Sequence, residues 1–192
     1  MVIGVLAMQG AYEEHINILQ DLDVSPVEIR NKNDLQNIDG IIIPGGESTT
    51  MGKLIRTLDI YNDLKEKIES GMPVWGTCAG MILLAKSICN DDTVHLGTMD
   101  IEVKRNAYGR QLGSFNTKSK VKDIGEDIKM VFIRAPYIEN IDDNVEVLSI
   151  VDNNIVAAKE NNMLVTSFHP ELTSDYRVHK YFLKMVENNR KA

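Results

Sequence analysis

The sequence predicts an α/β fold with three layers, in which helices flank a mostly parallel central sheet and an antiparallel portion follows toward the C-terminus. Along residues 1–86, short apolar runs alternate with segments whose apolar residues recur every three or four positions, as in a helix. Such alternation is typical of β–α–β units, whose strands pair in parallel and whose helices cover both faces of the sheet. From about residue 98, apolar runs instead follow one another with Asn-containing turns between them. Strands joined by tight turns pair antiparallel.

Strands and helices alternate along the first half of the chain. Tyr12, Ile16 and Leu19 recur at i, i+4 and i+7, which places them on one side of a helix. The segment from Ala79 to Lys86 is almost wholly apolar, so we expect a buried helix there. The predicted elements are strands at 3–7, 27–29, 39–43 and 73–77, and helices around 12–19, 48–54, 61–70 and 79–86.

The second half is predicted to form strands followed by one helix. Asp152-Asn153-Asn154 and Glu160-Asn161-Asn162 have the composition of hairpin turns. The last helix carries Val178 and Phe182 on its apolar side, and we expect His179 on its polar side. The predicted strands lie at 99–104, 129–133, 146–151, 155–159 and 164–168.

Length and composition indicate one domain spanning residues 1–192. Apolar residues make up 43% of the chain and charged residues 26%, as in soluble proteins. The net charge of −7 argues against a nucleic-acid partner. No apolar run reaches the roughly 20 residues that cross a bilayer, and the apolar first residues lack the basic leader of a secretory signal. We therefore expect a cytoplasmic protein that does not associate with a membrane.

The two cysteines, Cys78 and Cys89, are too few for a disulfide framework. If the segment between them is helical, its rise separates them by roughly 16 Å, whereas a disulfide requires about 7 Å or less between Cα atoms. No CxxC or HxxxH spacing indicates a metal site. We expect neither a metal nor a cofactor.

Cys78 lies in the pattern Gly76-Thr77-Cys78-Ala79-Gly80, between an apolar strand and an apolar helix. This is the spacing of a nucleophile elbow, a sharp turn that exposes its central side chain at the carboxyl edge of a sheet. A thiol with a pKa near 8.5 is only about 3% thiolate at pH 7. Catalysis would therefore also need a general base and oxyanion donors. On its own, the cysteine could equally be a small apolar residue in a tight turn.

Two further stretches are expected at the same edge. His169 follows an apolar strand, and in an extended segment it shares a side with Glu171, so the carboxylate can fix the tautomer of the imidazole. Gly45 and Gly46 follow another apolar strand, where backbone N–H groups can turn inward as an anion nest. Each stretch alone is compatible with a plain surface turn. Together they predict acyl transfer through a thioester at Cys78, because open α/β sheets bind ligands at this edge.

These motifs resemble the class I, triad-type glutamine amidotransferases, of which G-T-C-A-G at 76–80 and H-P-E at 169–171 are broad marks. Other stretches are similar to the glutaminase subunits of pyridoxal 5′-phosphate synthases: V-L-A-M-Q-G at 5–10, E-H at 14–15, P-G-G-E-S-T-T at 44–50, R-N-A-Y-G-R-Q at 105–111 and F-I-R-A-P at 132–136. The marks cover residues 5–171 and show no departure that would remove activity. The resemblance implies a flavodoxin-like glutamine amidotransferase fold.

The resemblance implies hydrolysis of L-glutamine to L-glutamate and ammonia. By it, Cys78 is the nucleophile, His169 the general acid/base and Glu171 its orienting partner. The backbone N–H groups of Gly46 and Ala79 correspond to the oxyanion hole. The implied glutamine-binding positions are Gly46, Glu47, Ser48, Arg105, Ile133 and Arg134. An arginine can hold the glutamine carboxylate in a fork, and a glutamate suits the α-ammonium. Which arginine takes the carboxylate stays open.

The resemblance also implies a partner, a TIM-barrel synthase subunit that uses the ammonia to make pyridoxal 5′-phosphate from a pentose phosphate and glyceraldehyde 3-phosphate. It implies assemblies of twelve subunits of each kind and a glutaminase that needs the synthase for activity. A peptide flip near Gly46 on docking would then complete the oxyanion hole. Gln9, Gly10 and the helix after them resemble the region that faces the synthase. We expect His15 to be an interface or structural residue rather than a catalyst.

Two other functions remain alternatives. Glutaminases that serve imidazole glycerol phosphate or purine synthesis share the Cys–His–Glu set, although the stretches at 44–50 and 105–111 argue against them. A non-catalytic scaffold subunit with an idle cysteine is also compatible with the fold alone. The complete set of Cys78, His169 and Glu171 argues against that scaffold.

Overall fold

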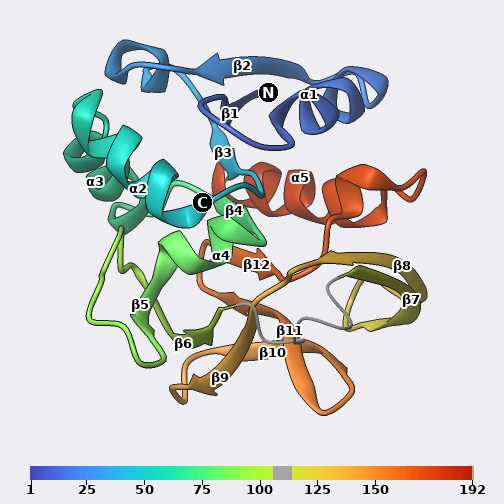
Figure 1. The fold of residues 1–192 in the computed structure, drawn as a ribbon. Coiled ribbons are helices and arrows are strands. Elements are labelled where there is room, and N and C mark those ends of the chain that lie inside the picture. The colour runs from blue at the N-terminus through green and yellow to red at the C-terminus, as the bar shows by residue number, and fades with distance from the viewer. Residues whose placement is uncertain (106–113, 192) are drawn as a thin grey trace.

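A computed structural model describes residues 1–105 and 114–191 of the chain (Figure 1). Residues 106–111 of the R-N-A-Y-G-R-Q stretch therefore lie outside the described residues. The helices are α1 (Tyr12–Asp21), α2 (Ser48–Thr57), α3 (Tyr61–Glu69), α4 (Ala79–Leu84) and α5 (Arg177–Asn189), with short 3₁₀ turns η1 (Lys32–Leu35) and η2 (Pro170–Leu172). The strands are β1 (Val2–Leu6), β2 (Ser25–Ile29), β3 (Gly40–Ile43), β4 (Val74–Thr77), β5 (Ala85–Ile88), β6 (Met99–Lys104), β7 (Ser114–Val121), β8 (Gly125–Ile133), β9 (Tyr137–Ile141), β10 (Glu146–Val151), β11 (Asn154–Glu160) and β12 (Met163–Thr166).

Within the described residues, the main sheet has the strand order β2-β1-β3-β4-β12-β11-β9-β6-β5, with β10 paired to β11. The strands from β2 to β12 run parallel to their neighbours. Beyond β12 the pairing becomes antiparallel, through β11 and β9, although β5 and β6 pair in parallel at the far edge. Strands β7 and β8 form a separate antiparallel pair. The predicted fold class, a mostly parallel sheet with an antiparallel C-terminal portion, is confirmed.

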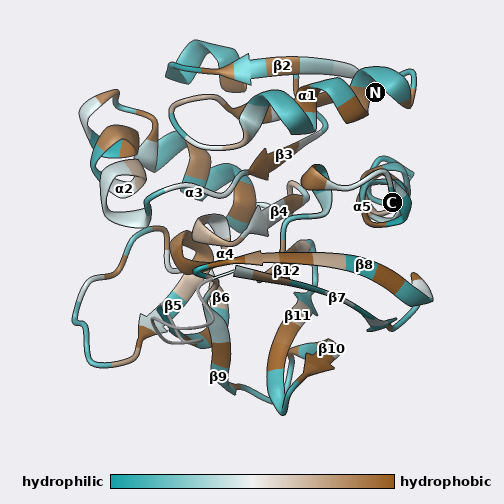
Figure 2. Cartoon of the chain, turned by 45° about the vertical axis from the view of Figure 1, so that its right-hand side comes forward, coloured by the Kyte–Doolittle hydropathy of each residue, from teal (hydrophilic) through white to brown (hydrophobic). Residues whose placement is uncertain are grey.

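The central strands are buried on both faces, which produces the three layers. Ile41, Ile43 and Val74 belong to the core that α2, α3 and α4 close. Their neighbours Ile42 and Trp75 point the other way, into the core under α1, α5 and the β7–β8 pair. Successive side chains of a strand alternate between the faces, so a strand with apolar residues at every position must be covered on both sides. In Figure 2 the ribbon of β3 has the hydrophobic colour, whereas hydrophilic and hydrophobic colours alternate along α1.

The helix predicted at 79–86 is shorter than expected. It ends at Leu84, and Ala85 has the extended backbone angles φ −61° and ψ 137°. Ala85 and Ile88 are buried while Lys86 and Ser87 between them are exposed, because the pairing shifts its register between Ala85 and Ser87. Pairing with β6 replaces the helix there. Strands β7 and β9 were not predicted, because β7 is polar at every position except Phe115 and Val121, and β9 is short.

Three adjacent parallel strands, β3, β4 and β12, lead to the segments that carry Gly46, Cys78 and His169. In the sheet, β4 lies between β3 and β12, with Ile43 opposite Gly76 and Thr166 opposite Thr77. The segments that follow these strands therefore emerge side by side at one edge. Among the described residues, no helix is both long enough and apolar enough to cross a membrane.

Candidate active site

Cys78 occupies a sharp turn between β4 and α4. Its φ is +49°, a left-handed conformation that a non-glycine residue adopts only when its surroundings enforce it. Here α4 packs against β3 so closely that a Cβ on Gly80 would lie 2.1 Å from the carbonyl oxygen of Ile43. A Cβ on Gly76 would lie 2.5 Å from the carbonyl carbon of Gly80. The two glycines of the pattern thus allow the approach that leaves the cysteine at the tip of the turn.

His169 and Glu171 come together just after β12. Nδ1 of His169 lies 2.7 Å from Oε1 of Glu171, and both side chains are buried. The backbone N–H of His169 donates to the carbonyl oxygen of Val131 at 2.8 Å, which ties this segment to β8. The contact between His169 and Glu171 was expected, but from an extended segment in which both side chains point to one side. Residues 170–172 instead form the 3₁₀ turn η2, which brings the carboxylate back toward the ring.

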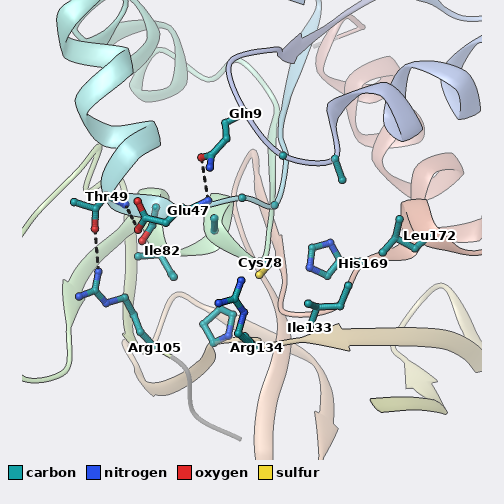
Figure 3. A pocket seen from close by; sticks show the side chains of 17 residues that line it. Gln9, Glu47, Thr49, Cys78, Ile82, Arg105, Ile133, Arg134, His169 and Leu172 are labelled. Atoms are coloured by element: carbon teal, nitrogen blue, oxygen red, sulfur yellow. Dashed lines mark hydrogen bonds between the residues drawn. The ribbon is translucent and has the colours of Figure 1, made fainter. Parts of the chain in front are cut away.

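The imidazole of His169 contacts Glu171 and interacts with the thiol of Cys78. Figure 3 shows the His169 ring and the Cys78 sulfur in the same pocket. Burial lowers the pKa of His169, but hydrogen bonds and charge interactions with Cys78 and Glu171 outweigh this effect and raise the pKa to about 10. The ring therefore carries a proton at neutral pH. An imidazolium in this position can donate a proton to a leaving group on the substrate.

A pocket of about 570 Å³ opens in front of Cys78, within the size range of small-molecule sites. Its lining includes most of the residues selected from the sequence: Gln9, Gly10, Gly46, Glu47, Ser48, Cys78, Ala79, Arg105, Ile133, Arg134 and His169. Ala79 is the first residue of α4, where a backbone N–H has no acceptor within its own helix. Gly46 approaches the same pocket from the loop after β3. Gly46 and Ala79 thus both lie in the wall of the pocket that holds Cys78.

Glu47 is the N-cap of α2 as well as a pocket residue. Its carboxylate accepts hydrogen bonds from the backbone N–H groups of Thr49 and Thr50, at 3.0 and 2.7 Å, and from the Thr50 hydroxyl at 2.6 Å. The hydrogen bond from the Thr50 side chain, with the backbone bonds, lowers the pKa of Glu47 to about 2. A fixed negative charge therefore lies at this end of the pocket.

The two candidate arginines differ in what they already contact. Nη2 of Arg105 pairs with Oδ2 of Asp91 at 2.7 Å, and its Nη1 lies 3.5 Å from the Thr49 hydroxyl. Arg134 is exposed at the pocket, has φ +44°, and has no recorded ion pair within the described residues. Figure 3 shows its side chain among those that line the pocket. Of the two, Arg134 is the one whose charge is available to a ligand.

The loop between β1 and α1 contacts the loop that carries Gly46. Oε1 of Gln9 accepts a hydrogen bond from the backbone N–H of Glu47 at 3.1 Å, and Ala11 N–H donates to the carbonyl oxygen of Gly45 at 3.3 Å. Gly10 has φ +84°, and a Cβ there would lie 1.7 Å from that same oxygen. A partner that moves this loop would also move one side of the oxyanion site.

Of the two roles expected for His15, interface or structural, its complete burial fits the structural one, whereas the solvent-exposed position expected for His179 is wrong. Both rings are fully buried, because α1 and α5 turn them toward Trp75 in the core. The spacing of His179, Phe182 and Val186 is i, i+3, i+7, and this could have placed His179 on the buried side. His15 lies behind Glu171 rather than in the pocket.

Sequence reasoning also missed some pocket residues. Thr49, Ile82 and Leu172 line the pocket, and Leu172 is 41% exposed there. Each of the three lies within four residues of a motif position, so nearness to a motif in the sequence could have identified them as pocket residues. Within the described residues, no group of three His, Cys, Asp or Glu side chains is placed to hold a metal ion.

Comparison with known proteins supports a relationship over nearly the whole chain. The sequence profile of the SNO glutamine amidotransferase family matches residues 5–188. A pyridoxal 5′-phosphate synthase subunit PdxT from Clostridium botulinum (strain Loch Maree / Type A3) is 58% identical over 189 residues, which cover 97% of this chain and 98% of that protein. A PdxT subunit from Streptococcus pneumoniae (strain CGSP14) is 55% identical over 194 residues, covering 99% of this chain and 100% of that protein. The solved structure of a glutamine amidotransferase superimposes with a TM-score of 0.93 at 41% identity, covering 97% of this chain and 100% of that one.

Proposed function

Because the chain belongs to the SNO glutamine amidotransferase family, we propose that it is the glutaminase subunit of a pyridoxal 5′-phosphate synthase. It hydrolyses L-glutamine to L-glutamate and ammonia as a single domain spanning residues 1–192, and it acts in the cytoplasm. The observation that carries the chemistry is the convergence of Cys78, His169 and Glu171 at the ends of β4 and β12, beside a pocket large enough for an amino acid.

In the first half of the reaction, the Cys78 thiol transfers its proton to His169, Sγ attacks the side-chain amide carbon of glutamine, and a tetrahedral intermediate forms. The backbone N–H groups of Gly46 and Ala79 stabilise the negative charge on its oxygen. His169 donates its proton to the amide nitrogen, the C–N bond breaks, and ammonia leaves. A thioester between Cys78 and the glutamyl group remains.

In the second half, water attacks the thioester carbon. His169, now neutral, accepts a proton from this water, and the C–S bond breaks to release L-glutamate and regenerate the thiol–imidazole pair. Glu171 holds the His169 ring through Nδ1 in both steps, so that Nε2 faces the reacting atoms. No metal or cofactor takes part in this scheme.

Fixed charges around the pocket suit the zwitterionic end of glutamine. The Glu47 carboxylate accepts the α-ammonium, and Arg134 pairs with the α-carboxylate because its guanidinium has no recorded ion pair among the described residues. Arg105, already paired with Asp91, supports the Glu47–Thr49 side of the site. Ser48 and Ile133 complete the contacts with the aliphatic part of the substrate.

The ammonia passes to a TIM-barrel synthase subunit, with twelve copies of each subunit in the full assembly. Gln9 and Gly10 lie at the docking surface, and the hydrogen bond between Gln9 and Glu47 supports this assignment because it connects that surface to the oxyanion loop. Docking then completes the oxyanion hole near Gly46. The sedimentation coefficient of the mixed subunits tests the stoichiometry.

The test of this function is glutamate release by the chain alone and with each candidate synthase. We expect strong stimulation by the pyridoxal 5′-phosphate synthase subunit and none by the imidazole glycerol phosphate or purine partners. Stimulation by one of those partners, with none by the pyridoxal partner, would change the assignment of the pathway. No glutamate release with any of them would favour a scaffold.

A further inference from the structure

A chain of buried polar side chains extends from the candidate triad into the core. Oε1 of Glu171 contacts His169, whereas its Oε2 lies 3.5 Å from Nε2 of His15. Nδ1 of His15 is in turn 2.9 Å from Nε2 of His179. Three elements that are far apart in the sequence therefore meet here: α1 brings His15, α5 brings His179 and η2 brings Glu171.

The contacts of His15 and His179 favour one tautomer of each ring, and so one direction for the hydrogen bond between them. If His15 carried its proton on Nδ1, its bare Nε2 would face the carboxylate oxygen of Glu171, and two lone pairs would oppose each other. His179 would then need a proton on Nδ1, an atom with no hydrogen-bond partner among the described residues. A buried donor without an acceptor is costly. With the proton of each ring on Nε2, His179 donates to His15, and the Nε2–H of His15 faces Oε2 of Glu171 across 3.5 Å, an electrostatic contact that is too loose for a full hydrogen bond.

The surroundings keep both rings neutral and in place. Burial, then the neighbouring His179 and His169, lowers the pKa of His15 well below its ordinary value, and burial lowers that of His179 to about 3. The indole of Trp75 packs edge-on against both rings, with centroids 5.3 Å from His15 and 4.8 Å from His179. Trp75 is itself anchored through Nε1 to the Thr166 hydroxyl at 3.2 Å, on the strand that leads to His169.

We propose that His15, oriented by His179, is a positioning residue that holds the Glu171 carboxylate for its contact with His169. The inference rests on the proposed glutaminase function and adds two residues that touch neither substrate nor the reacting atoms. Oε2 of Glu171 is buried and has no full hydrogen bond among the described residues, so the N–H of His15 at 3.5 Å is the polar group that holds it; without this N–H the carboxylate can rotate away from His169.

A matched pair of variants separates this role from simple core filling. Gln and Met have similar length and volume, but only Gln offers an N–H at the place of Nε2. In the complex with the synthase, we expect His15→Met to lower kcat for glutamate release about 10-fold with little change in KM. His15→Gln retains kcat within about 3-fold of wild type. The pair His179→Met and His179→Gln should follow the same order, with smaller differences.

Ile18→Val provides the control, because it loosens the packing of α1 without touching the polar chain. It should lower the unfolding midpoint and leave kcat unchanged. If the two His15 variants have equal kcat, or if Ile18→Val lowers kcat as much as His15→Met, the positioning role is wrong and His15 is a packing residue.

Two readouts need no glutamine turnover and so distinguish failure of this inference from failure of the proposed function. The ¹⁵N resonances of His15 in the full chain should show the Nε2–H tautomer between pH 6 and 8, whereas the Nδ1–H form would overturn the inference. The pH dependence of Cys78 alkylation should shift toward lower pH in His15→Met, because a displaced Glu171 supports the His169 proton less well. An unshifted profile contradicts the proposal even if glutamine is hydrolysed normally.

Discussion

The carboxylate of Glu171 lies against the ring of His169, with 2.7 Å between Oε1 and Nδ1 and both side chains buried. This contact uses Nδ1 and so leaves the other ring nitrogen, Nε2, for the thiol and the substrate. It also supports the protonated form of the ring, whose pKa is about 10 despite the opposing effect of burial. The predictions below follow from this pairing and from the fold around it.

Replacing Glu171 by Gln removes the negative charge but keeps the shape. The pKa of His169 should fall, and kcat for glutamate release should drop by about 10²-fold or more, because the imidazolium loses its partner. The rate of Cys78 alkylation by iodoacetamide as a function of pH reports the change. A profile identical to that of wild type would show that Glu171 does not influence the ring.

The same pairing makes stability depend on pH. A His whose pKa is about 10 in the folded state and about 6.5 in the unfolded chain binds its proton more tightly when folded. Its contribution is complete below about pH 6.5 and is lost as the pH rises toward 10. Urea unfolding between pH 6.5 and 9 should therefore show a steeper loss of stability for wild type than for Glu171→Gln. Equal slopes would contradict the raised pKa.

Gly80→Ala tests the close packing that creates the turn at Cys78. The added methyl would lie 2.1 Å from the Ile43 carbonyl oxygen, so α4 must move away from β3. We expect a loss of about 1–3 kcal/mol in the free energy of unfolding, with a fall in activity as the turn opens. Gly71→Ala is the control: it has open space but φ +99°, so it should cost about 1 kcal/mol and leave activity unchanged. Equal activity in the two variants would argue against the packing account.

The two pocket arginines should differ in their effect on substrate affinity. Arg134→Gln should raise KM for glutamine about 10- to 100-fold, since it removes a charge-assisted contact with the α-carboxylate. Arg105→Gln should raise KM less, because Asp91 already neutralises that guanidinium. Steady-state kinetics with the synthase present measure both, and Arg30→Gln at an exposed surface pair controls for net charge. The reverse order would assign the carboxylate to Arg105.

Much of this fold could be predicted from local sequence, because apolar runs such as Ile41–Ile43 are typical of strands that are buried on both faces. Residues from Ser114 to Val121 could not be recognised as a strand, because the exposed face of β7 is polar and its partner β8 decides the pairing. The end of the helix at Leu84 also depended on a distant partner, β6, rather than on a local stop signal.

Part of the candidate site could likewise be predicted from local sequence, and part of it depends on contacts in the folded chain. The positions of Cys78 and Gly46 follow from strand–turn–helix patterns, and parallel pairing then brings these turns to one edge. The burial of His15 and His179 could not be read from either residue alone, because each needs the other and Trp75 to form its surroundings. Contacts between α1, β4 and α5 are properties of the folded chain.

The central claim, that Cys78 is the nucleophile of a glutaminase, is tested most directly by glutamate release from Cys78→Ala in the complex with the synthase subunit. We expect no release above background, while the same complex continues to make pyridoxal 5′-phosphate when ammonia is supplied. Release of glutamate by this variant at a rate near that of wild type would contradict it.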